Sequence, residues 1–453
     1  MPRFSPPSPT RRTLLTGALA MAAVPAQAQN LLGSRALPVS GTQSFPLEAA
    51  PGIADIRPNT TSAVLTFNGT APGPVIRLRK GQPTRIALRN ALPDPLSIHW
   101  HGLRIDNPAD GVAGLTTNPV TGGGTGEILF TPPDYGTFIY RPLVPGRTAE
   151  LTGSGLAGIA VVEDSGLPAV DADHVLAISD WALTEQGALQ PFTASPGRLG
   201  NIITVNGIPA PARIAVAPGA RVRLRLANLC NARIMMIRFD GVRAYVVAVD
   251  GQPTDTFEPL KATLPFGPGN RFELVFDMPP EPGQRATVAA LIGQGFPLAI
   301  IETAGAASAK TVARPAIAPL PPNPLLSESI KLQRALRADL VLQGAGTEWA
   351  INGRKGLPSA GKPLFSIKSG QPVVLAVKNE SATPNVIHIH GHCFRALHPF
   401  DDGWEPYWLD TIIIPEGKTI RCAFLAGQPG QWLIGSTILE RLDGGLSAWF
   451  EVK

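Results

Sequence analysis

One sequence unit occurs three times along this 453-residue chain, at intervals of roughly 140 residues. In each copy an Asn-Gly pair precedes a glycine turn, and a segment of alternating apolar and polar residues follows the turn. The segment ends in an asparagine nine residues after the turn glycine, as in Gly81–Asn90, Gly219–Asn228 and Gly370–Asn379. A period of two is typical of β-strands that are buried on one side. The repeat therefore predicts an all-β protein of three similar domains.

The three copies also set the expected domain boundaries. We expect domain 1 at residues 45–164, domain 2 at 173–302 and domain 3 at 326–453. Residues 304–324 are rich in alanine and proline, which is typical of a semi-extended linker. The one helix that the sequence favours lies at Ser327–Ala338, where domain 3 begins.

Residues 1–28 have the features of an export signal. A twin-arginine pair, an apolar run and a small-residue cleavage site follow one another, at Arg11-Arg12, Leu14–Val24 and Ala26-Gln27-Ala28. The apolar run is too short to span a bilayer. We therefore expect a periplasmic protein that is exported by the twin-arginine pathway and has no membrane-inserted segment.

The net charge gives no reason to expect a nucleic acid or an anionic membrane as partner. The chain has 39 Lys and Arg against 34 Asp and Glu, a formal charge of +5. The leader contributes Arg3, Arg11 and Arg12 and no acid, so 36 basic and 34 acidic residues remain without it. A charge of +2 is too small to attract a polyanion.

Four of the seven histidines occupy equivalent positions in two of the repeats. His99 lies nine residues after Asn90, and His388 lies nine residues after Asn379. Each begins a His-x-His pair, which His101 and His390 complete, and alternate residues of a strand point to the same side. If the domains pack around a pseudo-threefold axis, the two pairs meet in a metal site. Imidazole ligands and the Irving–Williams order favour one copper ion, with zinc as an alternative.

Five motifs give the chain its resemblance to a known family. They are His99-Trp100-His101-Gly102-Leu103, Asp110-Gly111-Val112-Ala113-Gly114-Leu115, Phe130-Thr131-Pro132-Pro133-Asp134, Gly155-Leu156-Ala157-Gly158 and His388-Ile389-His390-Gly391-His392. In these the chain resembles the three-domain, laccase-like multicopper oxidases. The resemblance implies three cupredoxin-like Greek-key β-sandwiches in a pseudo-threefold arrangement.

Two residues beside the expected ligands also match the family. Asp110 matches the acid that supports water and proton traffic at the copper cluster, although a turn residue in an Asp-Gly pair is equally compatible with the sequence. His392 continues the alternation of the second His-x-His pair and is expected just behind the ligands.

The resemblance also shows which copper ligands this chain does not have. Eight ligand positions of the family carry other residues here: Arg141, Leu143, Asn385, Gly435, Ser436, Thr437, Arg441 and Leu446. The type 1 positions fall on Asn385, Ser436, Arg441 and Leu446, and no thiolate is left to form a blue copper site. His99 and His388 match the two type 2 ligands. His101 and His390 each match one ligand of a different type 3 copper, which leaves each such ion two ligands short.

These departures lead to three readings of the function. The first is a degenerate family member that binds one copper ion and has no laccase-type oxidase activity. The second is a metal-free periplasmic scaffold with a protein partner, similar in kind to the twin-arginine-exported cell-division protein of this family. The third is a copper-dependent oxidoreductase of reduced activity. The sequence identifies neither a substrate nor a catalytic residue.

Several other residues have two possible roles. Arg141 and Arg441 could pair with acids such as Glu440 or Asp443, or reach solvent, but Arg141 pointing into the histidine cluster would oppose a cation there. The aromatic loop 401–408 could be a partner surface or could pack back onto its own sandwich. Strand alternation places Cys393 away from the histidines. Cys230 and Cys422 are expected as buried thiols, and one disulfide among the three cysteines is possible.

Overall fold

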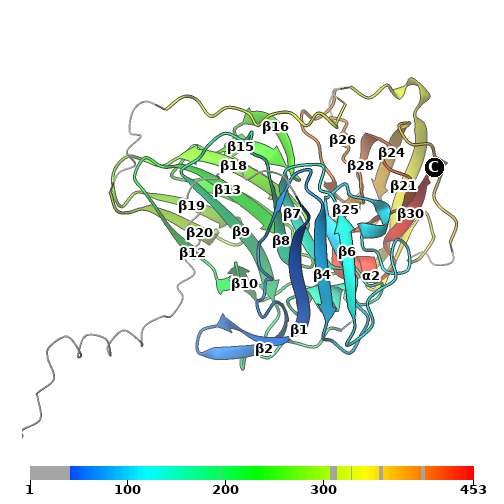
Figure 1. Ribbon diagram of the computed structural model, residues 1–453, viewed down its shortest axis with the longest axis horizontal. Coiled ribbons are helices and arrows are strands. Elements are labelled where there is room, and N and C mark those ends of the chain that lie inside the picture. The colour runs from blue at the N-terminus through cyan, green and yellow to red at the C-terminus, as the bar shows by residue number, and fades with distance from the viewer. Residues whose placement is uncertain (1–40, 194, 307–313, 328, 357–360, 399–402) are drawn as a thin grey trace, which may run out of the picture. The chain divides into compact units, whose positions relative to one another are not determined.

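The strands of the chain form six sheets, two in each of three cupredoxin-like β-sandwiches (Figure 1). The computed structural model describes residues 41–193, 195–306, 314–327, 329–356, 361–398 and 403–453. The expected signal at residues 1–28 lies outside the described residues, as does part of the expected linker. In the described part, no helix is long and apolar enough to cross a membrane. The expected all-β, three-domain fold is confirmed.

Domain 1 consists of two four-stranded sheets. The strands of the first sheet are, in sheet order, β2 (Thr60–Phe67), β1 (Gln43–Arg57), β4 (Thr84–Asn90) and β6 (Thr125–Phe130). The strands of the second sheet are β3 (Ile76–Arg79), β8 (Gly158–Glu163), β7 (Gly136–Pro142) and β5 (Ile98–His101). The short helices η1 (Asn107–Ala109) and α1 (Thr148–Gly153) lie in its connections.

Domain 2 has a seven-stranded and a five-stranded sheet. The first contains β11 (Ile208–Pro209), β10 (Ile202–Val205), β9 (Ala172–Trp181), β13 (Arg221–Asn228), β18 (Arg271–Asp277), β15 (Tyr245–Val249) and β16 (Gln252–Phe257). The second contains β12 (Ala212–Val216), β20 (Phe296–Thr303), β19 (Arg285–Ala290), β14 (Met235–Asp240) and β17 (Thr263–Phe266), with η2 (Leu260–Ala262) before β17.

Domain 3 has two five-stranded sheets. The strands of the first sheet are, in sheet order, β22 (Glu348–Ile351), β21 (Leu336–Ala345), β24 (Pro372–Asn379), β28 (Thr419–Leu425) and β26 (Arg395–Ala396). The strands of the second sheet are β23 (Ser366–Ile367), β30 (Ser447–Val452), β29 (Gly430–Ser436), β25 (Asn385–Ile389) and β27 (Thr411–Ile414). The short helices are η3 (Leu332–Arg334) and α2 (Leu439–Asp443).

The structure explains why each repeat segment ends in an asparagine. Asn90, Asn228 and Asn379 have no solvent exposure. Each side-chain amide donates at 2.8–3.0 Å to a carbonyl of the loop that follows and at 3.0–3.1 Å to a carbonyl more than 30 residues further along the chain. A buried amide in this place ties the end of one strand to the next connection. The Asn-Gly pairs form hairpin turns in which both residues have positive φ, which Asn and Gly tolerate best.

The helix expected at Ser327–Ala338 is wrong. In the described residues this stretch contains only the three-residue η3, and β21 begins at Leu336. From Leu336 on, burial alternates and the strand pairs in parallel with β24, as β1 pairs with β4 in domain 1. Tertiary pairing in the sheet thus outweighs a weak local preference for helix.

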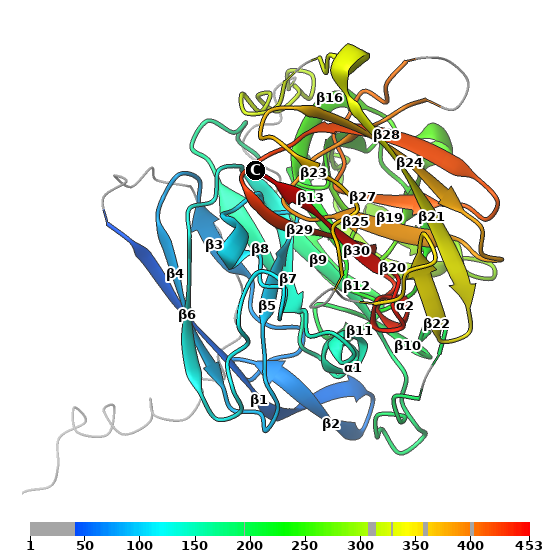
Figure 2. The ribbon, with the colours of Figure 1, turned by 90° about the vertical axis from the view of Figure 1, so that its right-hand side faces the viewer.

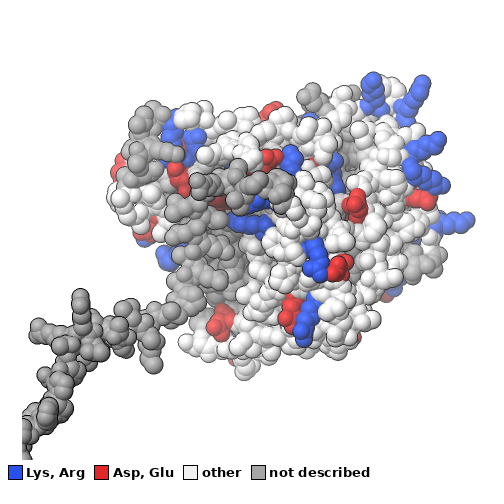
Figure 3. Space-filling model, in the orientation of Figure 1, with Lys and Arg blue, Asp and Glu red and all other residues white. Residues whose placement is uncertain are grey.

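Basic and acidic side chains lie near one another at several places on the face shown in Figure 3. In Figure 3, Lys and Arg side chains project from the side on which β21 and β24 lie, and acidic side chains lie among the basic ones elsewhere. Several of these charges pair, as Lys378 does with Glu380 at 2.8 Å. Such exposed pairs contribute little to stability, so the packing of the three domains depends on buried contacts.

Arg271, which begins β18, joins the three domains from a fully buried position. Its Nε donates to the carbonyl of Thr137 in domain 1 at 3.2 Å, and its Nη2 donates to the carbonyl of Asp250 in domain 2 at 2.8 Å. Both Nη atoms donate to the carboxylate of Asp410 in domain 3, with Nη1 at 2.9 Å from Oδ1. A bidentate pair of this kind fixes orientation as well as distance.

A second junction lies at the two short α-helices, which contact each other (Figure 2). The carboxylate of Asp443, at the end of α2, accepts hydrogen bonds from the backbone N–H groups of Gly146, Thr148 and Ala149 at 2.8–3.2 Å. From domain 2, the Asn231 amide donates to the carbonyl of Ala149 and to Glu440. The start of α1 therefore takes its capping group from another domain.

We expect Arg271→Met to destabilise the protein by about 3–5 kcal/mol, because it leaves the buried carboxylate of Asp410 without its cation. Urea unfolding measures the loss. The matched control is Arg285→Met, which breaks an exposed ion pair with Glu302 and should cost less than about 0.5 kcal/mol. Equal losses in the two variants would contradict the role of Arg271.

We expect Asp443→Ala to cost about 1–2 kcal/mol, because three backbone N–H groups at the start of α1 lose their acceptor. The control is Asp339→Ala, which changes an exposed residue of β21. We expect this change to leave the free energy of unfolding nearly unaltered. Hydrogen exchange should locate the effect at residues 146–149. Unchanged protection there would show that Asp443 does not hold α1.

Candidate metal centre

β5 of domain 1 and β25 of domain 3 bring the four predicted histidines together. The imidazole of His99 stacks on that of His390 with ring centroids 4.1 Å apart, and that of His101 stacks on that of His388 at 3.8 Å. The centroids of His99 and His388 lie 5.6 Å apart. All four side chains are buried. Two overlapping sets have ligand atoms within 4.8 Å of one another: His99, His388 and His390, and His101, His388 and Asp410.

Backbone carbonyls fix the proton on two of these rings. His99 Nδ1 lies 2.8 Å from the carbonyl oxygen of Asp110, and His388 Nδ1 lies 2.8 Å from that of Asp410. A carbonyl oxygen only accepts, so Nδ1 must donate in both cases. The Nε2 atom of each ring is then left with its lone pair.

Side chains fix the other two rings in the same way. Thr411 Oγ1 donates to Asp410 Oδ1 at 2.7 Å and accepts from His101 Nε2 at 2.9 Å, which leaves the lone pair of His101 on Nδ1. His390 Nδ1 donates to Asp110 Oδ2 at 2.9 Å. Every imidazole of the cluster thus gives its proton to an outer partner, an arrangement that is usual for metal-binding histidines.

Three of the remaining nitrogens are buried and have no hydrogen-bond partner among the described residues. They are His99 Nε2, His101 Nδ1 and His388 Nε2. A buried polar atom without a partner normally costs free energy. Three such atoms, each with a lone pair, fit a metal ion that accepts nitrogen donors.

Burial lowers the pKa values of His101, His388 and His390 and so favours their neutral forms. It lowers the pKa of His101 well below its usual value, and it lowers the pKa of His390 to about 3 and that of His392 to about 4. Burial acts to raise the pKa of Asp110, but His390 and His99 hold it far below the usual range. The cluster therefore combines neutral nitrogen donors with ionised carboxylates behind them, which is the state that a cation needs.

His392 lies behind the ligands. Its Nδ1 lies 2.7 Å from the carbonyl of His390, and its Nε2 accepts from the backbone N–H of Gly427 at 2.8 Å. Both nitrogens are used, so this ring holds the backbone at His390 and has no lone pair to offer. Asp110, in contrast, contacts His390 directly through its carboxylate.

The eight positions that were expected to be former copper ligands lie in domains 1 and 3. Arg141 lies opposite His99 across β5 and β7, and Gly435 lies opposite His388 across β25 and β29. Leu143 is buried in an apolar cluster, and Leu446 is buried in the core of domain 3. The backbone N–H of Thr437 donates to the carbonyl of Val386.

Hydrogen bonds connect the remaining positions. Arg441 donates to the carbonyl of Pro384 and to Asn385 Oδ1, both at 2.6 Å, while the amide of Asn385 donates to Asn379 and Ser381. The hydroxyl oxygen of Ser436 accepts from the backbone N–H of Ile438 at 3.1 Å.

The suggested pairing of the two arginines with Glu440 or Asp443 is wrong. Arg441 donates instead to carbonyl and amide oxygens and lies over the ring of Trp349 at 4.4 Å. Glu440 accepts from Asn231, and Asp443 accepts from backbone N–H groups. Uncharged oxygens suffice for a guanidinium when they lie in its plane of donors.

The three cysteines lie in the described part of the chain, and all are free and buried. The possible disulfide does not form. Burial raises the pKa of the Cys422 thiol to about 12, and it raises the pKa values of the Cys230 and Cys393 thiols well above their usual value. None of the three is a thiolate at neutral pH.

The sequence reasoning missed the residues that orient the histidines, namely Asp410, Thr411, Arg271 and Asp250. Asp250 Oδ2 accepts from the backbone N–H groups of Asp410 and Thr411, and burial together with Asp410 raises the pKa of Asp250 to about 7. A charged residue at the start of a mainly apolar strand was the available signal: Arg271 begins β18 and Asp410 directly precedes β27.

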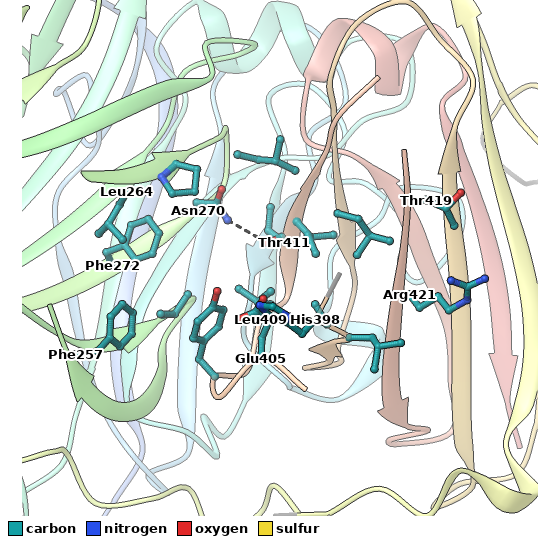
Figure 4. Close-up of a pocket in the computed structure, with 18 residues that line it drawn as sticks. Phe257, Leu264, Asn270, Phe272, His398, Glu405, Leu409, Thr411, Thr419 and Arg421 are labelled. Atoms are coloured by element: carbon teal, nitrogen blue, oxygen red, sulfur yellow. Dashed lines mark hydrogen bonds between the residues drawn. The ribbon is translucent and has the colours of Figure 1, made fainter. Parts of the chain in front are cut away.

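A cavity of about 670 Å³ lies between domains 2 and 3 (Figure 4). Its walls are mainly apolar, and the ring of Tyr407 stacks on that of Phe257 at 6.0 Å. One wall contains the hydrogen bond from the Asn270 amide to the carbonyl of Thr411, whose hydroxyl contacts His101. In the described part of the loop 401–408, Tyr407 lines this cavity and Trp408 is buried, so both pack back onto the protein.

Comparison with known proteins agrees with this architecture. Multicopper oxidase family models match residues 50–166, 172–305 and 332–453. The chain is 25% identical over 430 residues to the multicopper oxidase mco of Staphylococcus haemolyticus. The aligned region covers 91% of this chain and 89% of that protein. It is 26% identical over 421 residues to the cell division protein FtsP of Sodalis glossinidius, covering 86% and 85%.

Among solved structures, the multicopper oxidase from Pseudomonas thermotolerans is similar. The two share 30% sequence identity with a TM-score of 0.82, over 91% of this chain and 100% of that one. Three matched segments that together cover most of the sequence, and the histidine cluster between the first and the third, show that the chain belongs to the multicopper oxidase family.

Proposed function

We propose that this protein is an exported family member with degenerate copper sites, which binds one copper ion through His99, His101, His388 and His390. The observation that carries the proposal is the common orientation of the four rings, each of which donates its proton outward. A cluster kept only as packing would have no need of three buried nitrogens without partners.

The residues at the type 1 positions argue against laccase-type oxidation. Asn385 and Arg441 are bonded to each other, Ser436 has an oxygen where a thiolate is required, and Leu446 offers no donor atom. Without a type 1 copper, electrons from an organic substrate have no entry to the histidine cluster. The family implies copper binding, and the number of ions is our proposal.

Copper at this centre would supply a Lewis-acid and one-electron redox site. The residues of the chain would hold and orient it. Asp110 orients His390 and, through its carbonyl, His99, while Asp410 orients His388 directly and His101 through Thr411. Zinc would meet the same donors.

A second candidate function is a metal-free scaffold in the cell envelope. The likeness to FtsP, a cell division protein, favours it. So does the α1 segment, which Asp443 and Asn231 hold against α2 without any metal. In this reading the partner is a periplasmic protein, and residues 1–28 direct export by the twin-arginine pathway. The third candidate function is a copper-dependent oxidoreductase of reduced activity. It requires copper at the same histidines as the first candidate.

We expect the purified protein to take up one equivalent of copper, and His99→Ala/His388→Ala to take up none, because this double change removes a ring from each side of the cluster. Mass spectrometry after copper and then zinc supplementation measures the content. The matched control is His174→Ala, on β9 of domain 2, which should retain one equivalent.

Each result decides between the candidates. If the protein contains no metal after either copper or zinc supplementation, the first candidate is rejected and the scaffold is supported. Several copper ions together with a blue absorption band would reject both, because such a band requires a copper–thiolate site.

A further inference from the structure

The cavity between domains 2 and 3 is separate from the candidate metal centre. Neither the four histidines of the cluster nor the four positions expected to be former type 1 ligands are among the described residues that line it. Residues of β17 and β27 line it, and each of these strands is the last of its sheet, so two sheet edges face each other here. Its volume of about 670 Å³ is in the range of pockets that hold small organic molecules.

Aromatic rings form one end of this cavity. Phe257 on β16 and Tyr407 in domain 3 stack with their ring planes 25° apart, and both rings are half-buried. Leu264 and Phe272 are each 7% exposed, and Figure 4 shows them on the same side of the cavity as Phe257. Partly exposed rings in a concave place offer a contact area to a flat apolar ligand.

Glu405 adds a carboxylate to this apolar lining. It is half-buried, and it forms no ion pair with a described residue. The hydroxyl of Tyr407 donates a hydrogen bond to it, and its own backbone N–H donates to the carbonyl of Ala396 at 2.8 Å. Uncharged groups thus hold the carboxylate in place, and its charge is left without a cation.

The charges that act at the aromatic end are negative. Burial first, and then Glu405 and Asp250, raise the pKa of Tyr407 to about 12, and no cation of the described residues acts in the opposite direction. Arg421 also lines the cavity, but Figure 4 places its guanidinium on the side away from Phe257 and Glu405. The aromatic end therefore favours a positive charge.

We infer that this cavity binds a small organic cation, namely a protonated amine attached to a flat apolar body. The amine pairs with Glu405 and lies against the rings of Tyr407 and Phe257, whose faces attract a cation. The apolar body lies along Leu264 and Phe272. An anionic ligand would meet an unpaired carboxylate, and a purely apolar one would bury that carboxylate without a partner. The inference does not depend on the proposed copper site, because no histidine of the cluster lines the cavity.

The test uses the purified protein and three fluorescent probes. The probes share a dansyl group and the same alkyl chain, and they end in an amine, an alcohol or a carboxylate. Titrations at constant ionic strength, followed by dansyl emission and by calorimetry, measure the affinities. Wild type should bind one equivalent of the amine probe. It should bind the alcohol at least about ten-fold more weakly and the carboxylate more weakly still, because only the amine can pair with Glu405.

Variants of the lining locate the site. Glu405→Gln should weaken the amine probe at least about ten-fold and leave the alcohol within about two-fold, because it removes the charge and keeps the shape. The matched control is Glu416→Gln, at an exposed position of domain 3 outside the cavity lining, and it should change neither affinity. Phe257→Ala should weaken both probes, because it removes a ring that both of them contact.

Three results would overturn the inference. They are failure of wild type to bind any probe, equal affinity of wild type for the amine and the carboxylate, and equal affinity of wild type and Glu405→Gln for the amine. If Glu405→Gln does not fold, the selectivity of wild type among the three probes still decides. None of these results bears on copper binding, which the metal content measures separately.

Discussion

The bidentate contact between Arg271 and Asp410 connects the packing of the three domains to the histidine centre. Arg271 belongs to domain 2 and also reaches domain 1 through the carbonyl of Thr137. Asp410 in turn orients His388 through its carbonyl and His101 through the hydroxyl of Thr411. Because both partners are buried, removing either of them would leave the charge of the other unpaired in a medium of low dielectric constant. Interdomain geometry and ring orientation therefore depend on the same two residues.

Two regions of the protein differ in how their polar side chains are satisfied. In domain 3, Arg441 donates to Asn385 Oδ1, so these two residues are held by the protein's own hydrogen bonds. Between domains 1 and 3, four imidazoles donate protons outward, and three of their other nitrogens have no hydrogen-bond partner among the described residues. On the function proposed above, the first region no longer binds metal and the second still does.

Periodicity in the sequence predicts the three β domains and the His-x-His pairs, because a period of two and a fixed offset are visible along the chain. The orientation of the rings could not be predicted in this way. It depends on contacts such as His390 with Asp110, which join residues far apart in sequence. The helix expected near Ser327 failed for the same reason, since the pairing of β21 with β24 decides its conformation. Arg141 shows the limit most clearly: its residue type is visible in the sequence, but only the structure shows that its side chain is buried and that no carboxylate of the described residues acts on its pKa.

X-ray absorption at the copper edge of the loaded protein tests the central claim most directly, because it reports the atoms around the metal. The account predicts a first shell of nitrogen with the multiple-scattering pattern of imidazole, no sulfur, and no neighbouring copper. Loss of this pattern in His99→Ala/His388→Ala would place the ion between domains 1 and 3. A sulfur neighbour, or a shell of oxygen alone, would contradict the assignment of the metal to the four histidines.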